Sequence, residues 1–153
     1  MSRILFLDID GVLNSSSFFQ KMREENKPYT DQTLDENAVK LLESIVQTAN
    51  CDVVISSSWR LCNSKREIGD ILWRYSFRGT ILDTTPDISL FDRKAEILAW
   101  IKDHPEATSF CALDDNPIKL PFWIEVDPKL GLYDEYYIDL VLNCFQRQEN
   151  KHG

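Results

Sequence analysis

Glycine, proline and histidine are scarce in this chain. It has 5 Gly, 6 Pro and 2 His among 153 residues, which argues against a low-complexity or disordered chain. Hydrophobic residues make up 43% and aromatic residues 11%, and a chain of this length can bury a core large enough to fold unaided. We therefore expect one globular domain over residues 1–147, followed by a polar tail over residues 148–153.

Basic residues are outnumbered by acidic ones. The chain has 17 Lys and Arg against 25 Asp and Glu, a net charge of −8 at pH 7. Nonspecific binding along nucleic acid requires clustered cations, so this balance argues against it. Local basic stretches exist around Arg60, Lys65 and Arg66, and at Arg93 and Lys94. The ordinary interpretation of such stretches is a solvated helix face.

Paired cysteines and long apolar runs are also missing. The four cysteines, Cys51, Cys62, Cys111 and Cys144, show no CxxC spacing, and three of them lie in apolar runs where a buried thiol is common. This usage fits a reducing compartment. The apolar run 4–7 before Asp8 is too short for a signal peptide, and no other run approaches the length of a membrane span. We expect a cytoplasmic protein with no membrane partner.

Short apolar runs alternate with helical patterns along the chain. Capping patterns at Thr33-Leu-Asp-Glu36 and Ser64-Lys-Arg-Glu67 each precede apolar residues at helical spacing, and Asp92 is a plausible cap for another helix. A last amphipathic helix is expected over 137–145. Strands are expected at 4–7, 53–55, 80–82, 110–113 and 122–126. This alternation predicts a three-layer, Rossmann-like α/β domain with a mostly parallel sheet of about five strands.

Polar side chains follow three of these strands at their carboxyl ends. A single Asp in such a place is usually a turn or cap residue, but the carboxyl ends of parallel strands meet at one edge of the sheet. Several carboxylates gathered there repel one another unless a cation neutralises them, and oxygen ligands suit Mg²⁺, whereas Zn²⁺ prefers His or Cys. Neither His104 nor His152 is placed as a ligand. The residues concerned are Asp8, Asp10, Ser56, Ser57, Asp114 and Asp115.

These residues carry a resemblance to the haloacid dehalogenase (HAD) superfamily. Asp8-Ile-Asp10-Gly11-Val12 resembles its first motif, Ser56 or Ser57 the second, Arg93 or Lys94 the third, and Asp114-Asp115 the fourth. More narrowly, Phe6-Leu-Asp-Ile-Asp-Gly-Val-Leu-Asn14, Ser56-Ser-Ser-Trp-Arg60, Arg93-Lys-Ala-Glu-Ile97 and Leu113-Asp-Asp115 are similar to the HAD domains of Swiss Army Knife RNA-repair proteins. That group favours Arg93 as the basic residue, whereas the wider superfamily favours Lys94.

The resemblance implies a Mg²⁺-dependent phosphatase. Asp8 would attack phosphorus and form an aspartyl-phosphate, and Asp10 would protonate the leaving oxygen and then activate water. The metal would be held by Asp8, the carbonyl of Asp10, and either Asp114 or Asp115. The hydroxyl of Ser56 or Ser57 and the basic residue, Arg93 or Lys94, would clamp phosphate oxygens.

Three further residues near these motifs each have two interpretations. Gly11 either lets the backbone pass close to the phosphate or is an ordinary turn glycine. Trp59 either stacks on a base or is wedged into the core, and Arg60 either grips a substrate phosphate or pairs with an Asp.

The gaps between the motifs have room only for short loops and one helix each, so we expect a minimal cap or none, although residues 15–32 could form a small lid. An open site admits a phosphate on a large partner such as a nucleic-acid end, or a nucleotide-like phosphomonoester. The alternatives are a phosphoprotein phosphatase, a receiver-like module that binds Mg²⁺ and phosphate, and a non-catalytic scaffold.

Overall fold

A computed structural model describes residues 2–88 and 92–152 of the chain. Strands and helices alternate along most of it. In chain order the elements are β1 (Ser2–Leu7), α1 (Ser16–Glu24), α2 (Glu36–Ala49), β2 (Asp52–Ile55), the 3₁₀ helix η1 (Ser58–Leu61), α3 (Lys65–Arg74), β3 (Ile81–Thr84), α4 (Arg93–Asp103), β4 (Ala107–Asp114), β5 (Trp123–Glu125) and α5 (Tyr136–His152).

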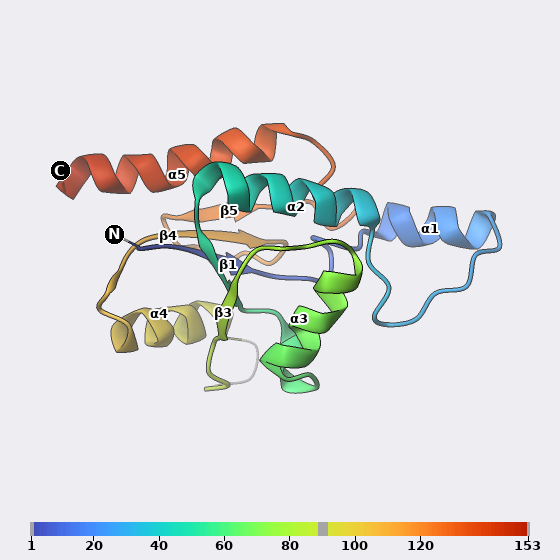
Figure 1. The fold of residues 1–153 in the computed structure, drawn as a ribbon, viewed down its shortest axis with the longest axis horizontal. Helices are drawn as coiled ribbons and strands as arrows, with labels where there is room; N and C mark the ends of the chain where they lie inside the picture. The colour runs from blue at the N-terminus through green and yellow to red at the C-terminus, as the bar shows by residue number, and fades with distance from the viewer. Residues whose placement is uncertain (1, 89–91, 153) are drawn as a thin grey trace.

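The five strands form one sheet in the order β3-β2-β1-β4-β5, and every neighbouring pair is parallel. Helices cover both faces of this sheet, with α2 and α5 on one side and α4 on the other (Figure 1). The predicted three-layer α/β fold with a parallel sheet of about five strands is confirmed.

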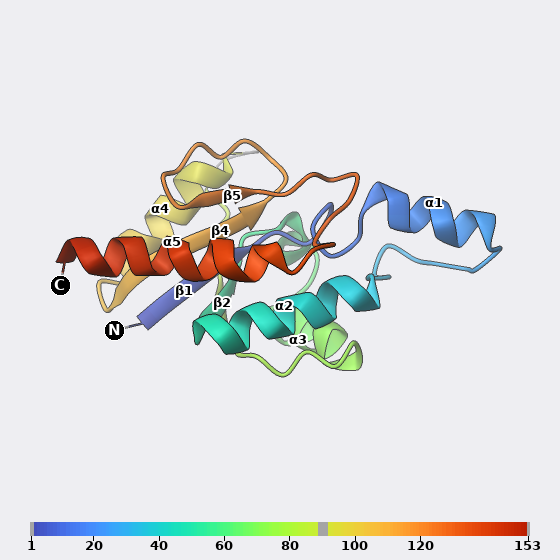
Figure 2. The same cartoon turned by 90° about the horizontal axis from the view of Figure 1, so that it is seen from above.

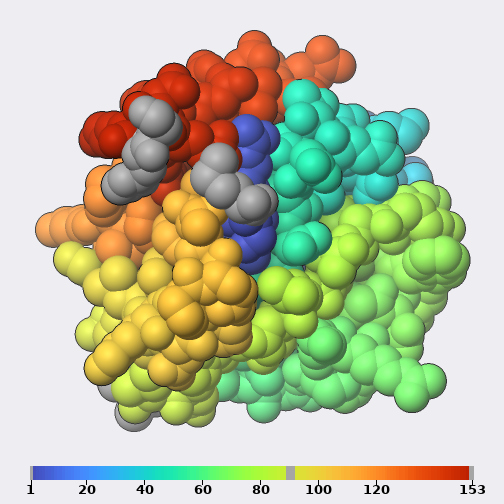
Figure 3. Space-filling model, turned by 60° about the vertical axis from the view of Figure 1, so that its left-hand side comes forward, coloured from blue at the N-terminus to red at the C-terminus, as the bar shows by residue number. Residues whose placement is uncertain are grey.

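Alternating side chains of β1 enter two separate cores, one on each face of the sheet. Leu5 and Leu7 join the larger core with α2, α3 and α5, whereas Ile4 and Phe6 join a smaller core with α4. Viewed from above, α2 and α5 lie beside each other over the sheet (Figure 2). On the face drawn in the space-filling view, the blue N-terminal segment is seen as a narrow strip between the teal and the yellow parts of the chain (Figure 3). A strand buried on both faces accounts for its continuous apolar sequence.

Two of the three proposed helix starts are confirmed. Ser64 makes a complete capping box with Glu67, and the Asp92 side chain accepts the backbone N–H of Ala95. The start at Thr33 is wrong, because α2 begins two residues later with Asp35 as its N-cap. The hydroxyl of Thr33 instead accepts the backbone N–H of Thr30, which closes a turn before the helix.

The polar segment 15–32 contains the helix α1, which the sequence did not predict. We call residues 16–35, which comprise α1 and the return loop to α2, the arm. No residue of α1 is buried, and the helix projects from one side of the molecule in both ribbon views. Phe19 stacks obliquely on Tyr29 with 4.9 Å between ring centroids, and Arg23 donates to the Tyr29 hydroxyl at 3.0 Å. The arm is thus held together by its own side chains.

Helix α5 runs to His152, so residues 148–152 continue the helix beyond the domain boundary proposed from sequence. In residues 2–88 and 92–152, no helix has both the length and the apolarity required to cross a bilayer.

Candidate active site

Three polar residues lie side by side at the carboxyl end of the sheet. Leu7 is in register with Ile55 on one side and with Leu113 on the other, so the next residues, Asp8, Ser56 and Asp114, are also aligned. The ladder continues through them, because the N–H of Asp8 donates to the Leu113 carbonyl and the N–H of Ser56 donates to the Leu7 carbonyl, both at 3.0 Å. The strand order reverses between β1 and β4, which is where ligands bind in open α/β sheets.

The site lies toward the α4 face. Side chains alternate along a strand, so Asp8, Ser56 and Asp114 are each expected to point to the same face as the residue two positions earlier. Those earlier residues are Phe6, Val54 and Ala112, and all three belong to the smaller core under α4. The first residue of α4, Arg93, confirms this direction by contacting both carboxylates.

Three carboxylates converge at this point. Oxygens of Asp8, Asp114 and Asp115 all lie within 4.8 Å of one another. Asp8 is only 3% exposed and Asp114 is fully buried. Burial, a hydrogen bond with Asp115 and the charge of Asp114 together raise the pKa of Asp8 from 3.8 to about 9. Burial also raises the pKa of Asp114, although Arg93 opposes that shift. Three converging hard oxygen donors fit a divalent cation such as Mg²⁺, which would offset the repulsion between these carboxylates.

Arg93 is the basic residue that reaches the carboxylates. Its Nη1 lies 2.8 Å from both side-chain oxygens of Asp114 and 3.2 Å from Oδ2 of Asp8. Lys94 is exposed and makes none of the ion pairs found in the described ranges. Of the two candidates for the third motif, the structure therefore brings Arg93 to the carboxylates and leaves Lys94 in solvent.

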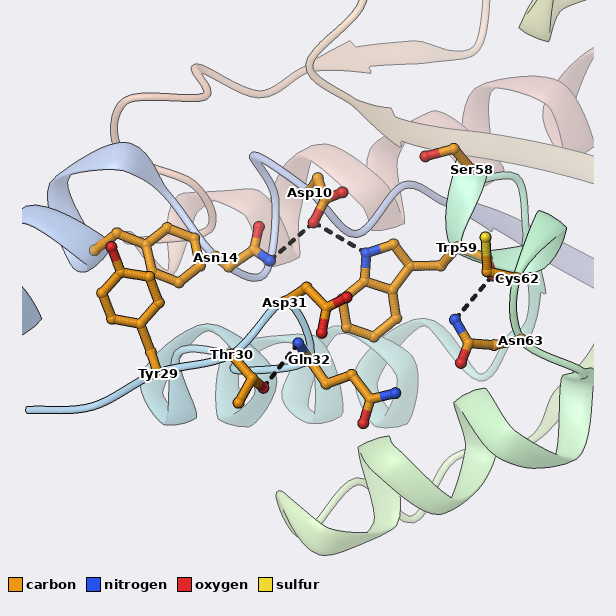
Figure 4. Close-up of a pocket in the computed structure, with 11 residues that line it drawn as sticks. Asp10, Asn14, Tyr29, Thr30, Asp31, Gln32, Ser58, Trp59, Cys62 and Asn63 are labelled. Carbon is orange, nitrogen blue, oxygen red and sulfur yellow. Dashed lines mark hydrogen bonds between the residues drawn. The ribbon is translucent and has the colours of Figure 1, made fainter.

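Asp10 stands apart from the three carboxylates. Its side chain is exposed, and Oδ1 accepts hydrogen bonds from Nδ2 of Asn14 at 2.9 Å and from the indole N–H of Trp59 at 3.0 Å (Figure 4). Trp59 is 8% exposed, so the core interpretation of this residue holds, but its N–H also fixes Asp10. These two donors were missed from sequence. Only the closeness of Asn14 to Asp10 could have suggested one of them.

Gly11 is required by two constraints. Its φ of +83° lies in the left-handed region that disfavours side chains, and a Cβ there would overlap the Asp115 carboxylate. The backbone N–H of Gly11 donates to the side-chain oxygen of Asn14 at 2.9 Å. Gly11 is therefore a turn glycine that also leaves room for a carboxylate of the site.

The two serines of the second motif differ in their bonding. Oγ of Ser57 accepts the backbone N–H of Trp59 and caps η1. Oγ of Ser56 is buried and has no hydrogen-bond partner in the described part of the chain. A buried hydroxyl without a partner is uncommon and marks a group available to a ligand. Because Ser56 is also aligned with Asp8, it is the better placed of the two to contact a phosphate there.

Arg60 has a role different from the expected phosphate contact. Its guanidinium bonds to the Glu96 carboxylate, to the carbonyl of Thr85 at 2.9 Å and to the carbonyl of Ser57 at 2.9 Å. Both side chains of the Arg60–Glu96 pair are only 6% exposed. The structure thus replaces the expected substrate contact with a buried ion pair that joins η1 to α4. The alternative expected from sequence, pairing with an Asp, is also corrected, because the partner of Arg60 is Glu96.

A cleft opens beside Asp10 between the arm and η1. It has a volume of about 770 Å³. Figure 4 shows Asp10 at its edge, with Tyr29 and Trp59 on opposite sides in this view. The lining residues are Asp10, Asn14, Phe19, Tyr29, Thr30, Asp31, Gln32, Ser58, Trp59, Cys62 and Asn63.

Comparison with known proteins agrees with this arrangement. A family model described as "HAD domain in Swiss Army Knife RNA repair proteins" matches residues 4–137. No curated protein and no solved structure matches the chain.

Proposed function

The chain belongs to the family of HAD domains found in Swiss Army Knife RNA-repair proteins, a family of the HAD hydrolase type, and from that premise we propose that it is a Mg²⁺-dependent phosphomonoester hydrolase with Asp8 as nucleophile. The observation that carries this proposal is the convergence of Asp8, Asp114 and Asp115 within 4.8 Å at the carboxyl end of the sheet. An isolated carboxylate there would be a turn residue, whereas three together form a cation site with a nucleophile inside it.

The reaction has two steps. A carboxylate oxygen of Asp8 attacks phosphorus in line, the bond from phosphorus to the leaving oxygen breaks, and Asp10 gives that oxygen a proton. In the second step Asp10 takes a proton from water, the hydroxide attacks phosphorus, and the bond from phosphorus to Asp8 breaks to release inorganic phosphate. Asp10 suits both proton transfers because its carboxyl group is held at the edge of the cleft by Asn14 and Trp59.

Positive charge and hydrogen-bond donors would stabilise the phosphoryl group. Asp8, the carbonyl of Asp10, and Asp114 or Asp115 would hold Mg²⁺, which when bound neutralises charge on the phosphate oxygens. Arg93 lies 3.2 Å from Asp8, where its guanidinium can also contact a phosphate on that residue. The free hydroxyl of Ser56 supplies a further donor from the neighbouring strand.

The proposed substrate is a nucleic-acid end or a nucleotide-like phosphomonoester. The family description supports this choice, as does the cleft beside Asp10, which is large enough for more than a phosphate. A phosphoprotein is the alternative. We also propose a cytoplasmic location, supported by the free state of Cys51, Cys62, Cys111 and Cys144.

The first test is hydrolysis of a chromogenic aryl phosphate with Mg²⁺ and with excess chelator. We expect turnover only with Mg²⁺, and Asp8→Asn should lower kcat on the order of 10⁶-fold, as removal of a nucleophile does elsewhere. Arg93→Ala and Lys94→Ala form a matched pair, of which only the first should lose most of the activity.

Two outcomes would contradict the proposal. Undiminished turnover in Asp8→Asn would exclude an aspartyl-phosphate on this residue. Stable retention of the acyl phosphate without turnover would favour a receiver-like module.

Substrate preference is a separate measurement, made with phosphorylated oligonucleotides and phosphopeptides. Activity on the peptides alone would exclude the nucleic-acid version of the proposal.

A further inference from the structure

We propose that the cleft beside Asp10 binds a single nucleoside as the leaving group, with no place for a second phosphate. This inference rests on the proposed function, because it assigns the cleft to the part of the substrate that departs. It narrows the substrate class to a nucleoside-like group that carries one phosphate.

The position of Asp10 defines the direction of the leaving group. Asp10 is separate from the three carboxylates but lines the cleft. Its Oδ1 is bonded to Asn14 and Trp59 on the cleft side of the loop (Figure 4). A residue that protonates the leaving oxygen must lie next to it, so the group attached to that oxygen occupies this cleft.

The walls of the cleft carry aromatic rings and uncharged polar groups. Phe19 and Tyr29 form an aromatic pair on the arm, and Trp59 forms the wall on the η1 side. Tyr29 is 40% exposed, so a face of this pair remains accessible. An exposed aromatic ring such as that of Tyr29 can stack on the flat face of any base. Gln32 and Asn63 add amide groups that can donate to and accept from base edges or sugar hydroxyls.

Charge in the cleft argues against additional phosphates. Among the described residues that line it there is no Lys or Arg, whereas Asp10 and Asp31 are both acidic and exposed. The nearby cations Lys94 and Lys119 line a different hollow next to Arg93. Arg23 on the arm donates to the Tyr29 hydroxyl at 3.0 Å and is not among the residues that line the cleft. A second phosphate on the leaving group would therefore meet mainly negative charge from Asp10 and Asp31.

The decisive comparison uses four small substrates. We would measure kcat/KM for adenosine 3′-monophosphate, adenosine 5′-monophosphate, ribose 5-phosphate and adenosine 3′,5′-bisphosphate. We expect the better monophosphate to exceed ribose 5-phosphate by about tenfold or more, because only the nucleotide offers a base for stacking. We also expect it to exceed the bisphosphate. The two monophosphates distinguish which end of the nucleoside carries the phosphate.

Two variants connect these preferences to the cleft. Tyr29→Leu should reduce the preference for nucleotide over ribose 5-phosphate, whereas Tyr133→Leu, an exposed tyrosine outside the cleft, should not. Asp31→Lys should raise the ratio of bisphosphate to monophosphate activity severalfold at low salt. That gain should shrink at high salt, because exposed charges are screened.

Binding separates a failure of this inference from a failure of the proposed function. If no phosphate ester is hydrolysed, calorimetric binding of the two adenosine monophosphates and of ribose 5-phosphate to wild type with Mg²⁺ still tests the cleft. Base-dependent binding that Tyr29→Leu weakens would support the inference. Equal kcat/KM values, or equal affinities, for nucleotide and ribose 5-phosphate would overturn the inference. A higher kcat/KM of wild type for the bisphosphate than for the monophosphates would also overturn it.

Discussion

Asp8 is a carboxyl group whose surroundings oppose its ionisation. It is almost fully buried beside Asp114 and Asp115, and Arg93 offsets only part of that cost. In the folded protein without metal, the pKa of Asp8 is raised to about 9, so the group holds a proton at neutral pH. A bound cation would take the place of that proton, which connects metal binding to the charge of the nucleophile.

This shift predicts a pH-dependent stability. Between pH 3.8 and about 9 the folded metal-free protein holds a proton on Asp8 that the unfolded chain has released. The free energy of unfolding therefore falls as pH rises through this window. Asp8→Asn removes the titrating group, so its Tm in chelator should fall less steeply than that of wild type between pH 5 and 9.

Excess Mg²⁺ should flatten the wild-type curve, since the cation replaces the proton. Asp70→Asn, a change of an exposed residue on α3, is the matched control and should follow wild type. Parallel Tm curves for wild type and Asp8→Asn would contradict a raised pKa at this position.

In the proposed mechanism, Trp59 is a positioning residue for the proton transfers of Asp10. Its indole N–H donates to Oδ1 of Asp10 at 3.0 Å. Trp59→Phe keeps a large ring but removes this donor, so we expect kcat to fall about tenfold with poor leaving groups, the usual effect of losing one hydrogen bond.

The readout is the dependence on the leaving group. The fall in kcat should be clear with alkyl phosphates and small with nitrophenyl phosphate, because the nitrophenolate leaving group departs with little need of a proton. Trp73→Phe is the control, because Trp73 is 58% exposed and its ring lies under Arg78. An equal loss on both substrates would show that Trp59 acts only through packing.

At the level of elements, one ion pair holds three parts of the site together. Arg60 extends from η1 to Glu96 on α4 and to the backbone after β3. The same helix begins at Arg93, which contacts Asp8 and Asp114. The pair therefore fixes α4 relative to the strand ends. In this way it holds Arg93 in place beside the carboxylates without contacting them itself.

Breaking this pair should destabilise the fold. Glu96→Ala leaves the Arg60 guanidinium buried without its carboxylate, and removing one partner of a buried pair costs about 3–5 kcal/mol. Urea unfolding would measure the loss. Glu25→Ala breaks the exposed pair of Glu25 with Lys27 and should leave the midpoint unchanged. A loss in Glu96→Ala no greater than in this control would mean that Arg60 finds another partner or water.

At the scale of the whole molecule, the sequence predicted the alternation of strands and helices. Apolar runs that end in Asp or Ser indicated where the strands end, and a parallel sheet brings those ends together at one edge. The arm was missed because α1 buries no residue and shows no apolar face toward the core. The pairing of Arg60 with Glu96 joins residues 36 positions apart, a separation at which no local pattern indicates contact.

The choice between adjacent candidates also required the fold. Ser56 and Ser57 are equivalent in sequence, and they differ because the second caps η1 whereas the hydroxyl of the first has no partner in the described part of the chain. Arg93 and Lys94 are neighbours, yet the start of α4 directs the first to the carboxylates. Such choices depend on the direction of one side chain, which helix and strand periods do not fix at the ends of elements.

The arm has a consequence for how such a protein can change over time. It contributes two aromatic rings and three polar residues to the cleft, yet its helix buries nothing in either core. Substitutions at the exposed positions 29–32 of the arm alter the shape offered to a ligand at little cost to folding, whereas Leu34 lies in the larger core and Asp35 caps α2. New specificities can therefore arise by drift in this segment while the reacting groups stay under strict selection.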